Sequence, residues 1–540
     1  TDFQVKLRGL RIELGEIEAA LLAQPGVAQS VVVLRTDAHA GDQLVGYLVA
    51  EPDSTIDPDA VKAGLAGSLP GYMIPAALMI MDAFPVNASG KLDRKALPAP
   101  VFEAKVFRAP STPIEEIVAG IFADLLGVER VGVDDDFFEL GGNSLVATQV
   151  VARLSAALNA DIGVRAMFEA PTVAALAARV ESHAGSGARQ ALTARQRPEY
   201  PPLSLAQQRM WFLNRFDADS AANNIPAAVR LTGALDLAAL RGAVADVVAR
   251  HESLRTIYPS QGGVAYQKVL SSTRALPALD VVQAAEDELP ELLREFVTRG
   301  FDVTAEPPVR LRVYRIGEQD YVLVVVVHHI AADGFSMRPL VRDMMMAYVA
   351  RTGEAEPGWS PLPVQYVDYA LWQRETLGSE DDRTSLISEQ LDYWRGALAG
   401  LPDELRLPGK PRPAVASYRA GTHRFRVPAE LIDALNGVAR DNGATLFMVV
   451  HSAFAALLAR LSGSGDIAVG IPVAGRGEQA LDDLVGMFVN TLVLRAEVDA
   501  ATAFTDLLAQ VRERDLQAFA HADVPFERLV EVLNPARSQA

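Results

Sequence analysis

Two stretches without hydrophobic periodicity divide the 540-residue chain into three blocks, and each block must therefore build its own core. Residues 99–110 contain two prolines, and residues 182–198 contain glycine, serine and three arginines but no acidic residue. Both compositions are typical of linkers. We therefore expect domains over residues 1–98, 111–181 and 199–540, a number that agrees with ~150 residues per domain.

The overall composition excludes several classes of protein. Half of the residues are apolar, the net charge is −18 and there is no cysteine. This apolar fraction is that of globular cores, and the absence of cysteine excludes disulfides, cysteine nucleophiles and cysteine zinc sites, which fits a cytoplasmic location. The acidic balance argues against a nucleic-acid or membrane partner. Because the sequence opens at Thr1 in what reads as mid-domain, we expect it to continue a longer protein.

The first block has the pattern of a small α+β domain. Residues 11–24 place Leu14, Ile17, Leu21 and Leu22 on one helical face. Two apolar runs follow at residues 28–35 and 42–51 and predict strands, and residues 57–70 predict a second helix that ends at Pro70 and Gly71.

The second block predicts a small all-helical domain of about 70 residues, a size that can fold alone. Thr112 and Glu115 have capping-box spacing around Pro113, and Gly127 follows the helix that they start. Apolar residues recur there at helical spacing, namely Ile114, Ile117, Val118, Ile121, Phe122 and Leu125. Further helices are predicted over residues 145–158 and 172–181.

The third block alternates helices with aliphatic strands, which predicts an α/β architecture. Helices are expected over residues 237–251, 336–351 and 445–461, and strands over 321–327 and 467–472. Its length of about 340 residues indicates two lobes.

The most informative segment of the third block is VVVVHHIAADG, residues 324–334. Strand side chains alternate between faces, so His328 and His329 cannot both point into one cavity, and only one of them can be catalytic. Asp333 follows closely enough to hold an imidazole tautomer or to anchor the turn. A buried histidine pair without chemistry is the plain alternative. A metal site is disfavoured because no further ligand lies at suitable spacing, and no G-x-S-x-G elbow supports a hydrolytic triad.

The second block contains DDDFFELGGNSL, residues 134–145, in which Ser144 stands at a helix start behind two glycines. A serine there is most often an N-cap. However, the glycines expose the hydroxyl, and eight acids against one arginine between Glu115 and Glu139 form an acidic docking surface. No neighbouring base activates Ser144, so we expect a passive acceptor of a modification.

These segments resemble the motifs of nonribosomal peptide synthetases. DFFELGGNSL resembles the attachment motif of peptidyl carrier proteins, and HHIAADG resembles the HHxxxDG motif of condensation domains. TDFQVKLRGLRIELGEIE and NASGKLDRKALP resemble the opening and closing motifs of the adenylation C-terminal subdomain. Further condensation-domain motifs follow in the family's order: LSLAQQRMWFL, RHESLRT, PVQYVDYALWQRE, GIPVAGR with GMFVNT, and HADVPFERLVEVLNPARS.

The resemblance implies a multidomain fold. It comprises a small α+β adenylation C-terminal subdomain, a four-helix-bundle carrier and a two-lobed α/β condensation domain similar to chloramphenicol acetyltransferase. Relative to the family, the second lobe ends early, so we expect it to be truncated. Such proteins make antibiotics and siderophores.

The resemblance also implies roles for individual residues. Ser144 would carry 4′-phosphopantetheine, attached by a phosphopantetheinyl transferase, so that the working thiol of a cysteine-free chain is a cofactor. His329 would be the active-site imidazole and His328 its structural neighbour. Asp333 would be structural and would pair with Arg255 of the RHESLRT motif, and Gly334 would let the cofactor arm approach. No metal is implied.

The implied reaction joins a donor acyl thioester to the α-amine of an aminoacyl group on a downstream carrier domain. An α-amine has a pKa near ~8, so roughly a tenth is already unprotonated at neutral pH. His329 therefore acts either as a general base or mainly as a group that positions the amine.

Two further residues belong to the adenylation motifs. Asp2 would be the hinge of the small subdomain, and Lys91 would orient the adenylation substrates. Because the adenylation core is expected upstream of Thr1, Lys91 would have no ATP site within this chain, and a solvated turn lysine is its plain alternative.

Four other functions compete with peptide-bond formation. An epimerisation domain shares HHxxxDG, but DYALWQRE and GMFVNTL resemble condensation domains. A heterocyclisation domain would have aspartates in place of the histidines. A non-catalytic recruitment module would not need the intact motif. An acyltransferase that uses coenzyme A shares H-x-x-x-D, but a fused carrier makes a free acyl donor unnecessary.

Overall fold

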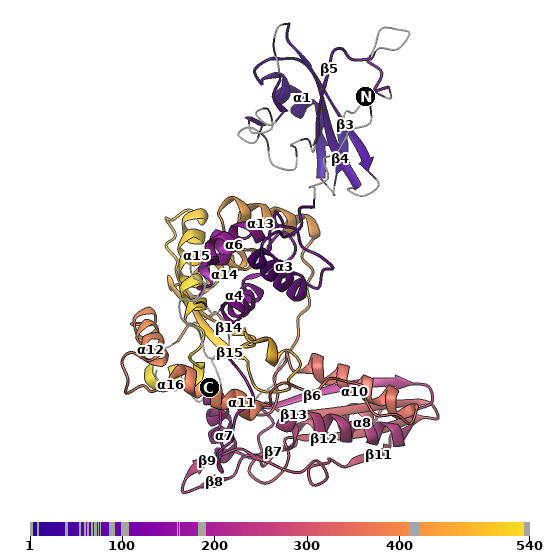
Figure 1. Cartoon of the computed structure of the whole chain (residues 1–540), viewed down its shortest axis with the longest axis vertical. Helices are drawn as coiled ribbons and strands as arrows, with labels where there is room; N and C mark the ends of the chain where they lie inside the picture. The colour runs from indigo at the N-terminus through magenta and orange to yellow at the C-terminus, as the bar shows by residue number, and fades with distance from the viewer. Residues whose placement is uncertain are drawn as a thin grey trace. The chain divides into compact units, whose positions relative to one another are not determined.

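The computed structural model separates the chain into two compact units, residues 1–108 with 422–441 and residues 109–421 with 442–540 (Figure 1). It describes all residues except 1–3, 8–9, 38–40, 53, 55, 59–60, 62–63, 66–68, 70–72, 74, 76, 86–91, 95, 99–106, 159, 161, 182–190, 403, 410–420 and 534–540.

The first unit contains the expected small α+β fold. The helix α1 (Leu14–Leu22) packs on the sheet β3-β4-β5, in which β3 (Val27–Asp37) pairs antiparallel with β4 (Gly41–Ala50) and β4 pairs parallel with β5 (Ala77–Met81). The core joins the helix face to the strands through the fully buried Ile17, Leu21, Val32 and Leu48. A separate hairpin, β1 (Gln4–Leu7) and β2 (Leu10–Glu13), and the helix α13 (Ala429–Asp441) belong to the same unit. The helix expected over residues 57–70 lies largely outside the described residues.

The second unit begins with a helical bundle. Its helices are α3 (Pro113–Leu126), α4 (Ser144–Leu158), the short α5 (Arg165–Glu169) and α6 (Val173–Glu181). The spacing of apolar residues did not predict α5, but the resemblance to a four-helix bundle implies a fourth helix. The predicted capping box is present, because the Thr112 side chain accepts from the Glu115 N–H while Glu115 accepts from the Thr112 N–H. The helices enclose Phe122, Phe137 and Leu154, which are fully buried.

A four-stranded sheet forms the first lobe of the α/β part (Figure 1). Its order is β11 (Leu279–Gln283), β12 (Val309–Gly317), β13 (Asp320–His328) and β6 (Asn224–Thr232), with only the β11–β12 pair parallel. Val322, Val324, Val326 and Val327 of β13 are buried and Val325 is half-buried, and the strand lies inside the sheet between β12 and β6. The other elements of this lobe are α7 (Leu205–Phe216), α8 (Leu237–Arg250), η2 (Glu252–Arg255), α9 (Leu289–Thr298), α10 (Met337–Thr352), α11 (Tyr366–Leu377), and the two-residue strands β7 (Thr256–Ile257), β8 (Ser260–Gln261), β9 (Val264–Ala265) and β10 (Lys268–Val269).

The second lobe is built on a strand pair. β14 (Asp466–Val473) and β15 (Asn490–Glu497) run antiparallel and pack against α14 (Leu446–Ser462) and α15 (Phe504–Ala520). The helices α12 (Leu386–Ala397) and α16 (Phe526–Leu533) and the short η3 (Gln479–Leu481) complete the described part. The expected sequence of a small α+β fold, a helical bundle and a two-lobed α/β fold is therefore confirmed.

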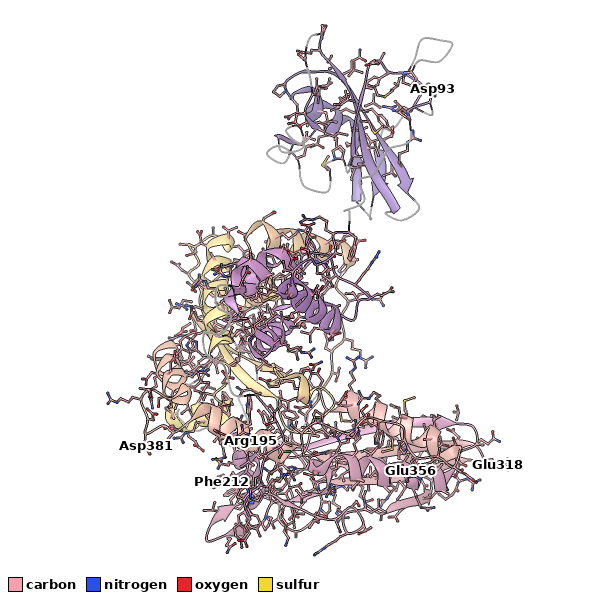
Figure 2. All side chains as sticks on the ribbon, in the orientation of Figure 1. Asp93, Arg195, Phe212, Glu318, Glu356 and Asp381 are labelled. Atoms are coloured by element: carbon pink, nitrogen blue, oxygen red, sulfur yellow. The ribbon has the colours of Figure 1, made fainter. Side chains whose placement is uncertain are left out.

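One stretch that the sequence assigned to a flexible linker is ordered at its C-terminal end. Arg195, labelled in Figure 2, pairs with Glu375 of α11, and Arg197 pairs with Asp368 and Glu252. Leu192 is buried against the same part of the fold. The sequence predicts a linker over residues 182–198, but Arg195 and Arg197 pair with acidic residues far away in the sequence.

Candidate active site and modification site

The strand β13 delivers both histidines of the HHIAADG segment to one end of the first lobe's sheet. Val324, Val326 and Val327 are fully buried, and the strand ends at His328. The chain then turns, so His329 and Asp333 stand beyond the last ladder pair, in which His328 faces Asn224 of β6.

His328 is sealed inside the fold. Its ring is fully buried at the edge of the Phe301 ring, and its Nδ1 accepts the Ile330 N–H at 3.1 Å. Burial, together with the nearby His329 and Arg310, lowers the pKa of His328 to about 4. The imidazole is thus neutral at neutral pH, and its position gives it a packing role.

His329 is the more open of the two imidazoles. Its side chain is half-buried, and its backbone N–H donates to the Asn223 carbonyl at 2.8 Å, which fixes the start of the turn. Its Nδ1 has no hydrogen-bond partner among the described residues. That Nδ1 atom is itself buried, so the structure shows a half-buried ring that is fixed at its backbone and has one nitrogen enclosed by the protein.

Asp333 is fully buried and holds the turn to the second lobe. Its Oδ2 accepts the Phe488 N–H at 2.9 Å and the Val489 N–H at 3.1 Å. Its Oδ1 accepts the Ser336 N–H at 2.7 Å and the Ser336 hydroxyl at 2.8 Å, and lies 3.4 Å from the Arg476 guanidinium. A carboxylate with this many donors fixes a backbone turn.

The pairing expected between Asp333 and Arg255 is wrong, because Arg476 occupies that position. Arg255 instead donates to the Leu270 carbonyl and pairs with Glu252. Arg476 lies 143 residues beyond Asp333, in the GIPVAGR motif, so no local spacing connects the two. The order of the family motifs was the only sequence signal that could have indicated Arg476.

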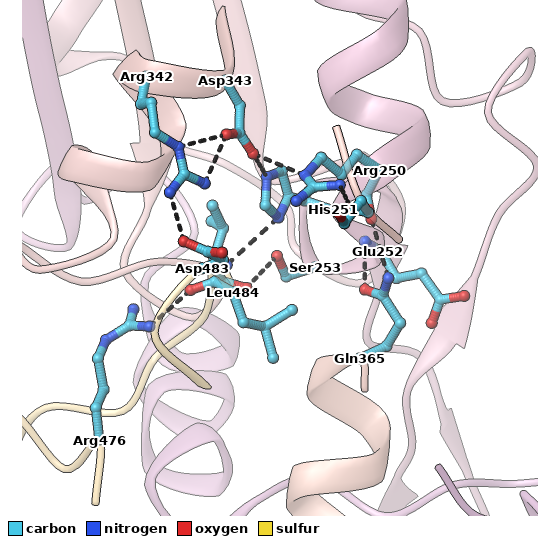
Figure 3. Close-up of polar contacts among 12 residues, drawn as sticks. Arg250, His251, Glu252, Ser253, Arg342, Asp343, Gln365, Arg476, Asp483 and Leu484 are labelled. Atoms are coloured by element: carbon cyan, nitrogen blue, oxygen red, sulfur yellow. Dashed lines mark hydrogen bonds and ion pairs between the residues drawn. The ribbon is translucent and has the colours of Figure 1, made fainter. Parts of the chain in front are cut away.

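The RHESLRT segment makes its polar contacts with Asp343 and with the chain next to Leu484, and Figure 3 shows these residues. His251 lies 2.9 Å from Asp343 Oδ2, while its Nδ1 faces the Val485 N–H at 3.4 Å. Burial lowers the pKa of His251, so the neutral ring donates to Asp343 and accepts from Val485. Ser253 donates to the Val485 carbonyl at 2.8 Å. This segment therefore fixes the backbone at Val485. The same stretch of chain continues to Phe488 and Val489, which donate to Asp333.

Gly334 lies beside this turn with free space in front of it. A Cβ built at Gly334 would meet no protein atom within 4 Å. The protein itself therefore does not require glycine at this position, and a close approach by another molecule remains the expected reason for it.

Ser144 is the first residue of α4, and its neighbour performs the capping. The Asn143 side-chain oxygen accepts the N–H groups of Leu145 and Val146 at 3.0 and 3.1 Å, so the N-cap is Asn143 and not Ser144. Gly141 has a φ of 100°, and a Cβ at Gly142 would lie 2.2 Å from the Phe137 ring. The two glycines are thus needed for the turn and for close packing, and the Ser144 hydroxyl is not used in capping.

The expected exposure of Ser144 is wrong for this arrangement of the second unit. The residue is 1% exposed, and its Oγ lies 3.0 Å from the Oγ1 of Thr445, the N-cap of α14. The ion pairs that hold this face are Arg153 with Asp482 at 2.5 Å and Arg165 with Glu513 at 3.1 Å. The helical bundle therefore uses its arginines here, and not its acidic side, to contact the second lobe.

A cavity of about 630 Å³ lies between the same parts of the second unit. On one side it is lined by α4, and on the other by α11 and by the segment that follows β14. Its wall includes Phe488 and Val489, whose N–H groups hold Asp333.

Other expected sites are not described. Asp2 and Lys91 lie outside the described residues. Within the described part of the chain, no group of three or more His, Asp or Glu side chains could hold a metal ion. No single described helix is long and apolar enough to cross a membrane, although α13 and α14 pass that test together as a bent pair.

Three family models match the chain in the expected order. The model described as the AMP-binding enzyme C-terminal domain matches residues 16–91, and the phosphopantetheine attachment site matches residues 116–180. The condensation domain model matches residues 197–540, which is more than half of the chain.

Known proteins match the same arrangement. A dimodular nonribosomal peptide synthase from Bacillus subtilis is 49% identical over all of this chain, which spans 23% of that relative. The X-domain from teicoplanin biosynthesis, solved in complex with OxyB, is 37% identical over 65% of this chain and 77% of its own, with a TM-score of 0.61. A four-domain nonribosomal peptide synthetase bound to AMP and glycine is 28% identical over 64% of this chain and 26% of its own, with a TM-score of 0.55.

Proposed function

Because this chain belongs to the condensation-domain family of nonribosomal peptide synthetases, we propose that its second unit forms a peptide bond. The donor acyl group is carried by the chain's own carrier domain, and the acceptor is an aminoacyl group on a downstream carrier. The observation that supports this best is the arrangement of the HHIAADG turn. Asp333 is anchored by five contacts, His328 is fully buried, and His329 is only half-buried.

His329 would receive the acceptor α-amine. Its half-buried ring would accept a hydrogen bond from the amine, through Nε2 because Nδ1 is itself buried, and would take the proton that the nitrogen loses as the new C–N bond forms and the thioester C–S bond breaks. A thioester is already activated, so holding the two reacting groups together supplies much of the acceleration. The Asp333 contacts serve this positioning by fixing the turn on which His329 stands.

Members of this carrier family bear phosphopantetheine covalently, and we propose Ser144 as its attachment point. The residue fits the group, because its hydroxyl is free of capping duty and stands at the N-terminus of α4, where the helix dipole favours a phosphate. When attached, the group supplies a thiol on a flexible arm. A phosphopantetheinyl transferase is the partner that this chemistry requires, and an upstream adenylation core would supply the acyl group.

The test measures peptide formation by the full chain after its carrier domain has been loaded with a donor acyl group. With an acceptor supplied, we expect a dipeptide product of unchanged donor configuration, and we expect His329→Ala to lower the rate by about 100-fold or more if the ring acts as a base. The measurement is product mass together with chiral analysis.

Two controls separate the alternatives. The wild-type chain should gain the mass of phosphopantetheine when it is treated with coenzyme A and a phosphopantetheinyl transferase. Ser144→Ala should abolish this gain, and the variant should therefore carry no donor acyl group. An inverted donor without a peptide product would indicate epimerisation. Full turnover by the His329→Ala chain with both substrates loaded would contradict the role given to His329, and no product from the wild-type chain would favour a recruitment module.

A further inference from the structure

Gln207 is a fully buried residue in the first turn of α7, and the oxygen of its side chain closes the start of that helix. The Gln207 Oε1 accepts the Ser204 N–H at 3.2 Å, while the Ser204 hydroxyl accepts the Gln207 N–H at 3.2 Å. This reciprocal pair is a capping box. Because a backbone N–H can only donate, the contact also identifies which end of the Gln207 amide is the oxygen, and the other end is the donor Nε2.

The amino end of Gln207 meets the active-site turn. Its Nε2 donates to the Ile330 carbonyl at 3.0 Å and to the Tyr258 hydroxyl at 3.2 Å. Tyr258 is itself fully buried, and its hydroxyl donates to the same carbonyl at 3.4 Å. Both N–H groups of the amide and both lone pairs of the carbonyl are thus occupied. These three buried groups come from separate segments of the chain and satisfy one another.

Ile330 directly follows His329, and its backbone is held at both of its polar groups. Its N–H donates to His328 Nδ1 at 3.1 Å, and its carbonyl accepts from Gln207, which lies 123 residues away. On the other side, the His329 N–H donates to the Asn223 carbonyl at 2.8 Å. The backbone that carries the His329 side chain is therefore fixed before and after that residue.

A half-buried imidazole can act on a substrate only when its ring points in the right direction. The direction of the His329 side chain follows from its backbone, so a rotation of the peptide that joins it to Ile330 would turn the ring. Asp333 holds the far end of the same turn, and Gln207 holds the near end. A displacement of about 1 Å can lower a rate about a hundredfold. The bond from Gln207 can therefore matter for catalysis although Gln207 is itself enclosed by protein.

We propose that Gln207 is a positioning residue for His329, and this inference rests on the proposed function. The Gln207 amide holds the Ile330 carbonyl, and the fixed backbone then directs the imidazole toward the acceptor amine. Gln207 acts through the turn and not on the substrate. The start of α7 is thus both a helix cap and a support for the active-site turn.

The test is a single-turnover measurement on the full chain, with a donor on its carrier domain and an aminoacyl N-acetylcysteamine thioester as the acceptor. Gln207→Met keeps the length of the side chain and removes its amide. We expect the rate at saturating acceptor to fall by about tenfold, because the ring is misdirected, and the half-saturating acceptor concentration to stay within about twofold. Gln208→Met, at the exposed neighbouring position of α7, is the matched control and should behave as wild type.

Two further variants separate positioning from a loss of stability. Ser204→Ala removes the other half of the capping box and leaves the Ile330 carbonyl bonded, so it should weaken the start of α7 and keep the rate. Tyr258→Phe removes the second donor to that carbonyl and should lower the rate by about threefold, which keeps the proposal testable if Gln207→Met does not fold. A rate that falls as much in Ser204→Ala as in Gln207→Met, or an unfolded Gln207→Met with an unchanged rate in Tyr258→Phe, would overturn the assignment.

A double variant shows whether Gln207 acts through the ring. When Gln207→Met is added to the His329→Ala chain, we expect no further fall in the rate, because no imidazole remains to be positioned. Additive losses would mean that Gln207 supports the fold alone. An unchanged rate in Gln207→Met, while His329→Ala is slowed, would equally contradict the proposal.

The position of the ring can also be observed without turnover. The chain has eight histidines, and the His329 ring signal in the NMR spectrum of histidine-labelled protein is assigned by its loss in His329→Ala. We expect this signal to shift in Gln207→Met and to stay unchanged in Gln208→Met, and the absence of a shift would overturn the assignment. A shifted signal, in a protein whose His329→Ala variant keeps full turnover, would contradict only the proposed function.

Discussion

The environment of a single side chain separates residues that look equivalent in sequence. His328 and His329 are adjacent, yet His328 is fully buried with a pKa lowered to about 4, whereas His329 is only half-buried. Arg255 and Arg476 are both candidates for an acid's partner, yet only Arg476 reaches Asp333. In each case burial and contact, rather than residue type, determine the chemistry.

The two arginines make a direct prediction. Arg476→Ala removes a buried partner of Asp333 and of two backbone carbonyls, and should lower the free energy of unfolding by about 3 kcal/mol. Arg255→Ala removes a half-buried contact at the edge of the site and should cost about 1 kcal/mol. Urea denaturation followed by tryptophan fluorescence measures both. Equal losses, or a larger loss for Arg255→Ala, would contradict the assignment of Arg476.

At the scale of one helix, capping of α4 falls on Asn143 and leaves the hydroxyl of the adjacent Ser144 unused. Asn143 closes the N-terminus of α4, so the adjacent hydroxyl takes no part in capping. The glycines before it provide the turn and the contact with Phe137. The attachment motif is therefore a helix start in which structural and chemical tasks fall on different residues.

The cap can be tested separately from the attachment point. Asn143→Ala should destabilise the carrier helices by about 1 kcal/mol, whereas Asn143→Asp, which keeps an acceptor oxygen, should cost far less. Hydrogen exchange of the first turn of α4 reports the change directly. Unaltered exchange in the Asn143→Ala protein would assign the cap to another residue.

At the scale of the second unit, the second lobe covers the serine that we propose as the attachment point. Ser144 is 1% exposed and faces Thr445 at 3.0 Å, which leaves no room for a phosphate on its oxygen. Attachment of the arm therefore requires the carrier to leave this position.

A disulfide tests that requirement, because the natural chain has no cysteine to interfere. A Cβ at Gly477 would lie 2.8 Å from the Ala152 Cβ, within a small shift of the ~3.8 Å typical of disulfides. Oxidised Ala152→Cys/Gly477→Cys protein should gain the phosphopantetheine mass at least about tenfold more slowly than the same protein after reduction. Ala152→Cys by itself is the control. Equal rates in the oxidised and reduced proteins would show that Ser144 is accessible where it stands.

Local patterns predicted much of what the structure contains. The capping box at Thr112, the strand that ends in two histidines and the helix that begins at Ser144 depend on residues within one or two turns of each other, so periodicity and spacing reveal them. The order of the motifs then indicated the family and its domains.

Tertiary structure decided which of those residues meet. Arg476 rather than Arg255 holds Asp333, and Thr445 covers Ser144. Each of these contacts joins positions more than 100 residues apart, where spacing carries no information about distance in space. The sequence by itself determined the elements and the chemical groups available, whereas burial, pairing and access follow from how the lobes and the carrier pack, since side-chain environment is a property of the folded chain.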